Sequence, residues 1–350
     1  MLEICISFLF FYVKIIIGDE YMKKLNIIVI LLMLIMVLVS CGSEETPYTY
    51  KEDKDHGKAT ITGVRYNDQA EMVIPTYINN LRVVGIAEQA FKNHDEITTL
   101  SVPPTVEIID DFAFWACHNL KTIEFTGDSH LEEIGNAAFE LCKSLVEVKI
   151  PASVKKLGMS AFAKCSSLTL VTFEDGINLE EISNGAFEET RIRTITIPNS
   201  VKVIRTGAFD ACKSLTSIKL PDNLQEIEGF TFRDCEALTE ITIPRNVSWI
   251  RDSTFKNCYR LAKVTFLEDT VLATISDEAF YNCLNLDNVV IPLSIRNISF
   301  YAFGDCTNLN NFSYLGTTEQ WNNLNIAPSW CPYSKISTVH CSDGDVEITQ

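Results

Sequence analysis

The sequence predicts a curved, β-rich solenoid of α/β type, made of about ten coils of 22–25 residues and closed by a cap at each end. Two observations predict it: a phenylalanine recurs ten times at nearly constant spacing, and every copy is followed by a short strand-like stretch. A unit of this length cannot bury its own apolar face, so neighbouring units have to stack. Parallel strands at about 4.8 Å per coil give a rod about 50 Å long.

The recurring phenylalanine lies in a constant apolar setting. It follows alanine in eight copies and threonine in two, at Thr231 and Thr254. An isoleucine or leucine stands five residues before it, and another aliphatic residue stands three residues earlier still. This register predicts that every copy buries the same side chains. The ten copies are Phe91, Phe114, Phe139, Phe162, Phe187, Phe209, Phe232, Phe255, Phe280 and Phe303.

A short alternating stretch follows each phenylalanine, as in Ile218-Lys219-Leu220-Pro221. Apolar residues with period 2 favour a strand, and proline ends it because proline lacks the N–H that a ladder needs. In the three 25-residue copies a phenylalanine closes the strand, and a longer acidic turn replaces the proline. These turns are Thr126–His130, Glu174–Asn178 and Leu267–Val271.

Composition excludes some classes of protein. The chain has 350 residues, of which 47% are hydrophobic, so it can bury a sizeable core and is not disordered. Its formal net charge of −17 would repel the phosphates of a nucleic acid, so we expect no nucleic-acid partner.

The N-terminus predicts export. Lys23 and Lys24 precede an apolar run, Ile27 to Val39, which is short for a membrane span and typical of a signal peptide. We assign the signal peptide to residues 1–40 and expect Met22 to be the true start. An uncleaved membrane anchor and a two-helix membrane hairpin remain alternatives.

The end of that run, Leu38-Val39-Ser40-Cys41, resembles the lipobox of bacterial lipoproteins. The resemblance implies cleavage before Cys41 and attachment of a diacylglycerol to its sulfur. Residues 41–56 would then be an acidic linker, and the membrane would be a partner only through this lipidated N-terminus. The implied location is the bacterial cell surface.

The consensus I-x-x-x-A-F-x-x-C-x-x-L-x-x-I-x-I-P resembles the BspA-like leucine-rich repeats of bacterial surface proteins, over roughly residues 47–340. The resemblance implies a right-handed leucine-rich-repeat solenoid with an N-terminal cap at 57–85, repeats at 86–310 and a C-terminal cap at 311–350. It also implies a surface or adhesion-related role.

Eight cysteines occupy one repeat position, three residues after the phenylalanine; His94 and Thr190 occupy it in the other two coils. Thr190 divides the cysteines into groups of three and five, so pairing between adjacent coils would leave two thiols over. One thiol per coil also lacks the paired spacing of zinc sites. We therefore predict buried free thiols at Cys117, Cys142, Cys165, Cys212, Cys235, Cys258, Cys283 and Cys306.

A disulfide between Cys331 and Cys341, in the C-terminal cap, is left open. Trp321 and Trp330 lie in the same cap, where we expect them to cover the end of the core.

No catalytic motif accompanies the repeat, so we predict no enzyme, no metal and no cofactor. A solenoid offers a long, regular binding surface, and we expect a monomer that binds an extracellular protein or carbohydrate. Candidate binding residues are Trp249, because exposed tryptophans often anchor interfaces, and the outward Lys149 and Lys219. The alternatives are an envelope spacer without a ligand and a hydrolase with its site in the C-terminal cap.

Overall fold

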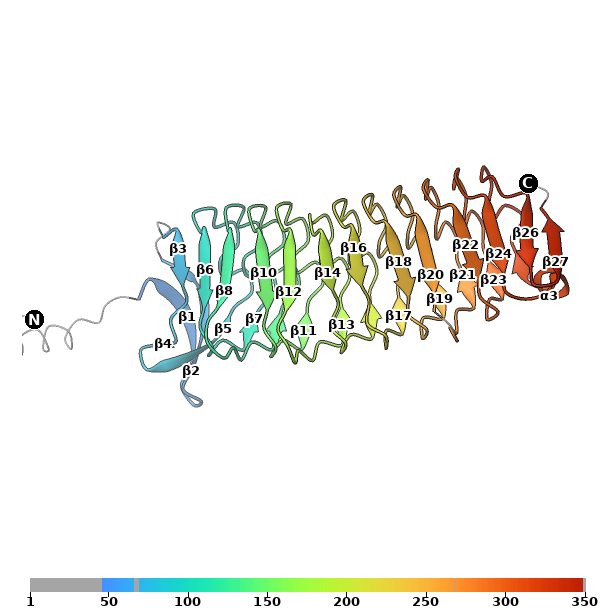
Figure 1. Ribbon diagram of the computed structural model, residues 1–350. Helices are drawn as coiled ribbons and strands as arrows, with labels where there is room; N and C mark the ends of the chain where they lie inside the picture. The colour runs from blue at the N-terminus through green and yellow to red at the C-terminus, as the bar shows by residue number, and fades with distance from the viewer. Residues whose placement is uncertain (1–45, 66–68, 268, 349–350) are drawn as a thin grey trace, which may run out of the picture. The chain divides into compact units, whose positions relative to one another are not determined.

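Short parallel strands form two of the three sides of each coil in the computed structural model, which describes residues 46–65, 69–267 and 269–348. From Pro47 onward these residues form one unit. Figure 1 shows its coils following one another from β3 to β26. The signal peptide, Met22 and Cys41 lie outside the described residues. Among those described, no helix is long and apolar enough to cross a membrane.

The first face consists of the strands that end at the predicted proline or phenylalanine, continued by two strands of the C-terminal cap, β24 and β26. Their side chains alternate between the core and the surface, as period-2 patterning predicts. The strands are β3 (Glu71–Val73), β6 (Thr99–Val102), β8 (Thr122–Phe125), β10 (Glu147–Ile150), β12 (Leu170–Phe173), β14 (Thr194–Thr196), β16 (Ser217–Lys219), β18 (Glu240–Ile243), β20 (Lys263–Phe266), β22 (Asn288–Ile291), β24 (Asn311–Tyr314) and β26 (Thr338–Cys341).

The second face consists of the longer β5 and of two-residue strands, each of which ends at the aliphatic residue five before a repeated phenylalanine; β25 continues this face in the C-terminal cap. They are β5 (Leu81–Ile86), β7 (Ile108–Ile109), β9 (Glu133–Ile134), β11 (Lys156–Leu157), β13 (Glu181–Ile182), β15 (Val203–Ile204), β17 (Glu226–Ile227), β19 (Trp249–Ile250), β21 (Thr274–Ile275), β23 (Asn297–Ile298) and β25 (Asn325–Ile326).

The third side is a run of turns around the phenylalanine, and it too is bonded from coil to coil. The N–H of each repeated phenylalanine donates to the next coil, as Phe114 does to the carbonyl of Ala138 at 2.8 Å. Residues two before and two after it have positive φ, for example Ala137 (50°) and Leu141 (65°). Their N–H groups also reach the next coil, which satisfies the buried backbone without a helix.

The core is a stack of the ten repeated phenylalanines, all fully buried. Consecutive rings are nearly parallel, with centroids 4.9 Å apart at Phe91–Phe114 and 5.9 Å apart at Phe162–Phe187. The two threonines that replace alanine are buried as well, and each donates its hydroxyl to a carbonyl three residues earlier, at 2.6 Å for Thr231 and 2.7 Å for Thr254. The predicted β-rich solenoid is confirmed.

The N-terminal cap begins earlier than predicted. Residues 48–53 form β1 (Tyr48–Asp53), where the sequence suggested an acidic linker over 41–56; β1 pairs antiparallel with β2 (Lys58–Val64). Tyr48 is 5% exposed and donates its hydroxyl to the carbonyl of Val73 at 2.6 Å. This apolar anchor explains why the stretch is ordered despite its charges. β4 (Tyr77–Ile78) completes the cap by pairing with β5.

The C-terminal cap covers the last phenylalanine. Trp321 and Trp330 are each 5% exposed, and the ring of Trp330 meets Phe303 edge to face with centroids 5.9 Å apart. Trp321 lies on α3 (Thr318–Asn322), the single helix of the described residues, and β27 (Gly344–Glu347) closes the edge of β26. The predicted covering role of both tryptophans is confirmed. With these caps the first face has twelve strands, two more than the ten repeated phenylalanines.

Candidate binding surfaces on the solenoid

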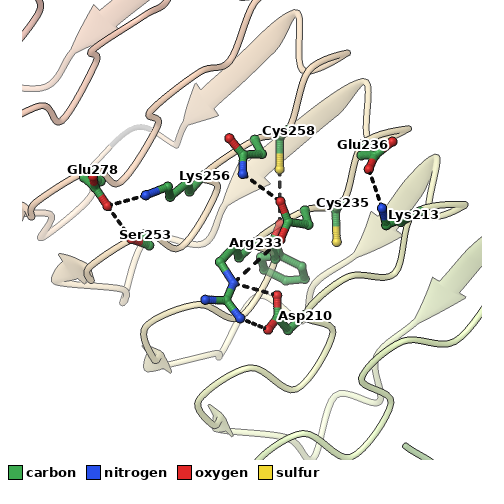
Figure 2. A network of polar contacts seen from close by, with 12 residues as sticks. Asp210, Lys213, Arg233, Cys235, Glu236, Ser253, Lys256, Cys258 and Glu278 are labelled. Carbon is green, nitrogen blue, oxygen red and sulfur yellow. Dashed lines mark hydrogen bonds and ion pairs between the residues drawn. The ribbon is translucent and has the colours of Figure 1, made fainter. Parts of the chain in front are cut away.

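The eight repeat cysteines line the core as free, buried thiols, as predicted. Each donates its S–H to the carbonyl of the phenylalanine in the preceding coil, at 3.0 Å for Cys117 and 3.3 Å for Cys235. Burial raises the pKa of the Cys212 thiol to about 12. Figure 2 shows Cys235 and Cys258 projecting in the same direction from neighbouring coils. The repeat thiols therefore act as small buried side chains of the core.

In one of the two coils without a repeat cysteine, Thr190 donates to the carbonyl of Phe187 at 2.9 Å and lies 3.2 Å from the sulfur of Cys212. This coil also has 22 residues, because a single residue separates Thr190 from the next core residue, Ile192. Cys331 and Cys341 are likewise free, so the disulfide that the sequence left open is not formed.

The strand ladder of the first face is interrupted or weakened at four junctions, three of which lie beside the long turns. β8 and β10 share no ladder, nor do β12 and β14, and β20 pairs with β22 only at Lys263 and Asn288. Two extra residues at the strand end displace one coil edge from the next, and the strands separate there. A fourth junction, between β16 and β18, is also unpaired although it has no long turn.

The first groove, which we call the 170–220 groove, has a volume of about 680 Å³ beside the turn Glu174–Asn178. It forms where a 25-residue coil precedes the 22-residue coil. Its lining is rich in hydroxyl groups, including Thr172 and Thr196, and includes Lys219. Lys149 lies nearby and pairs with Glu174 at 2.9 Å, which holds the pKa of that carboxyl below its usual range.

The second groove, which we call the 262–315 groove, has a volume of about 560 Å³ beside the turn Leu267–Val271. Three exposed aliphatic side chains from two successive coils line it: Val290 (40% exposed) and Leu293 (54%) from one coil, and Leu315 (56%) from the next. Lys263 and Asp287 add opposite charges to its lining. The three 25-residue intervals were the sequence signal for these grooves, but the sequence did not show that a longer turn would open one.

Trp249 lies on the second face, so it is not part of either groove. It is 44% exposed, its indole N–H donates to the hydroxyl of Ser276 in the next coil, and the guanidinium of Arg251 lies 4.6 Å from its ring centroid. The structure thus places Lys219 in the 170–220 groove and Lys149 beside it, but separates Trp249 from both.

Ion pairs link the coils across the second face. Arg205 lies between Glu181 at 2.7 Å and Glu228 at 2.8 Å, and these hydrogen bonds raise its pKa. Lys155 and Lys156 pair with the acidic residues one coil earlier. Exposed pairs of this kind contribute little stability each, but they occupy the charges of this face with one another.

The third side carries a polar network of its own. Figure 2 shows Arg233 reaching across to Asp210 in the preceding coil, while Lys256 is directed toward Glu278. Asp210 is 7% exposed and accepts two hydrogen bonds from Arg233, which raise the pKa of the guanidinium. Within the described residues, no cluster of three or more histidine, cysteine, aspartate or glutamate side chains could hold a metal ion.

These features define a solenoid of parallel strands. The same core side chains recur from coil to coil, and the irregularities lie on its surface. The profile of the BspA type leucine rich repeat region (6 copies) matches residues 84–216 and 180–310. The chain therefore belongs to the BspA-type leucine-rich-repeat family. No curated protein matches.

Solved structures of bacterial leucine-rich-repeat proteins are similar to this chain. The pneumococcal vaccine antigen PcpA is 20% identical, with a TM-score of 0.55, over 87% of this chain and 88% of that one. A leucine rich cell surface protein from Faecalibacterium prausnitzii is 25% identical, with a TM-score of 0.44, over 80% of this chain and 96% of that one. A leucine-rich repeat protein from Bacteroides ovatus is 24% identical, with a TM-score of 0.42, over 80% and 89% of the two chains.

Proposed function

We propose that this protein is a lipid-anchored cell-surface module that binds an extracellular protein or glycan through its first face. The observation that carries the proposal is the 262–315 groove, where two successive coils expose three aliphatic side chains. Contiguous apolar surface of this kind marks interaction sites in soluble proteins. The second face offers less, because its charges are largely paired with one another.

The anchoring part of the proposal rests on the resemblance of Leu38-Val39-Ser40-Cys41 to a lipobox. One diacylglycerol carries two chains, which is enough for stable anchoring. Cells fed radiolabelled palmitate should label the wild-type protein and not Cys41→Ala. An unlabelled, soluble wild type would contradict the anchor.

The binding part can be tested by probing arrays of glycans and extracellular matrix proteins with the full chain in detergent. Leu293→Ser combined with Leu315→Ser should abolish a hit that uses the 262–315 groove. Val146→Ser is the control, since Val146, directly before β10, is also exposed (47%) but lines neither groove. Loss of the hit in the control alone would refute the groove, and an array without hits would favour an envelope spacer.

A further inference from the structure

A hollow of about 300 Å³ opens on the third side, away from both grooves. It exists because two successive coils carry glycine, Gly185 and Gly207, two residues before the phenylalanine. The backbone does not require glycine there. Ala137 and Ser160 occupy the same position with φ of 50° and 55°, close to the 58° and 63° of the glycines. The missing side chains therefore leave a space two coils wide, about 10 Å.

Apolar side chains wall this hollow at both ends. Met159, from the preceding coil, is 50% exposed, and Phe230, from the following coil, is 37% exposed. The guanidinium of Arg233 lies 5.0 Å from the ring centroid of Phe230 and so covers one side of it. The walls can accept the hydrocarbon part of a guest side chain.

The lining also includes a carboxylate without a partner. Within the described residues, the side chain of Glu188 makes no hydrogen bond or ion pair, although it is only partly exposed. The nearby cations are already engaged: Arg233 with Asp210, and Lys164 with Glu140 at 3.2 Å.

The charges around Glu188 do not balance. Four carboxylates (Glu140, Glu188, Glu189 and Asp210) face two cations (Lys164 and Arg233). Burial raises the pKa of Glu188, and the neighbouring carboxylates raise it further, against the opposing effect of Lys164. An incoming cation would relieve this unfavourable charge.

We propose that this hollow binds a lysine or arginine side chain presented by a basic segment of a partner protein. Its methylene stem would pack between Met159 and Phe230, and its charged end would pair with Glu188. The net charge of −17 would attract such a segment from a distance. This site goes beyond the proposed function, because it lies on a different side of the coil and does not depend on the first face.

The probe is a fluorescein-labelled tetralysine peptide, titrated against the full chain in detergent at low ionic strength. Glu188→Gln should weaken its binding about tenfold, as expected for one charge-assisted contact. Glu189→Gln removes the same charge from the adjacent, exposed residue that does not line the hollow, and it should change binding less than about twofold. Equal losses in the two variants would show diffuse attraction and overturn the site.

A second pair of variants tests the space itself. Gly207→Phe fills the hollow with a residue that the equivalent Phe112 and Phe230 show to be compatible with this backbone, and it should abolish binding. Gln89→Phe makes the same change at the same repeat position outside the hollow and should leave binding unchanged. Unaltered binding by a folded Gly207→Phe would overturn the proposal. If that variant does not fold, the comparison of Glu188→Gln with Glu189→Gln decides.

Two further readouts identify the ligand chemistry. Wild-type affinity should fall as pH is lowered through the raised pKa of Glu188, and Glu188→Gln should lose this dependence. Tetralysine acetylated on every side chain should not compete. If it competes equally, or if a chitosan tetramer binds and tetralysine does not, the assignment to a basic protein segment is wrong.

Discussion

The role of the eight repeat cysteines as buried core side chains can be tested quantitatively at Cys235. This residue is fully buried, and its thiol donates to the carbonyl of Phe209 at 3.3 Å. Cys235→Ala removes one sulfur atom and one weak hydrogen bond. The carbonyl of Phe209 keeps a second donor, the N–H of Cys212 at 3.2 Å, so no polar group is stranded. We expect the free energy of unfolding to fall by about 1–2 kcal/mol, chiefly from the small cavity.

Two further variants give values for comparison: we expect Cys235→Ser to lower the free energy of unfolding no more than Cys235→Ala does, and Phe232→Ala to lower it more. A buried hydroxyl without a partner would cost about 1–3 kcal/mol, but here the carbonyl of Phe209 is in place to accept its hydrogen bond. We therefore expect serine to cost no more than alanine. Phe232 is stacked between Phe209 and Phe255, with centroids 5.8 and 5.4 Å away. Deleting that ring should cost about 3–5 kcal/mol.

The assay is urea unfolding followed by circular dichroism, combined with hydrogen exchange to locate the damage. Nearest-neighbour coupling predicts that the adjacent coils lose protection first. Thiol titration provides the independent check, because the repeat cysteines are free and buried away from the reagent: all eight should be unreactive in the native protein and reactive in denaturant without reductant. A serine variant much less stable than the alanine variant, or thiols that need a reductant, would refute the reasoning.

Two other substitutions test the packing of the coils. Gly158→Ala should lower the free energy of unfolding in urea by about 1–3 kcal/mol, because the added Cβ would lie 2.4 Å from the backbone of Gly135. Gly85→Ala is the control and should lose far less, because its Cβ would meet only the side chain of Thr60 within 3.4 Å. Tyr48→Phe removes the hydroxyl that donates to Val73 and should cost about 0.5–1.5 kcal/mol, seen as faster hydrogen exchange in β1; unchanged exchange would show that β1 is held by other contacts.

The core of the solenoid was predictable because it depends on a pattern that recurs in every coil. The phenylalanine register predicted which side chains are buried. The division of the eight repeat cysteines by Thr190 into two odd-numbered groups predicted free thiols. Both predictions are confirmed. The N-terminal boundary was not predictable in the same way. The strand that ends at Asp53 looked like a linker because half of it is charged, and only its pairing with β2 and the burial of Tyr48 show that it is part of the cap.

The candidate sites required the tertiary structure. Trp249, Lys149 and Lys219 all looked outward in the sequence, but the coil places the tryptophan on one face and the lysines near a groove on another. Likewise, a glycine at 185 or 207 is unremarkable alone, and becomes a hollow only because the two coils are adjacent.

By itself, the sequence determined the repeat, the direction of each side chain and the composition of the core, because these follow from local periodicity and from the need of each coil to bury one apolar face. Only the tertiary structure decided where the surface is interrupted. A turn two residues longer opens a groove, and an absent side chain leaves a hollow, according to what the next coil, more than 20 residues away in the sequence, places beside it.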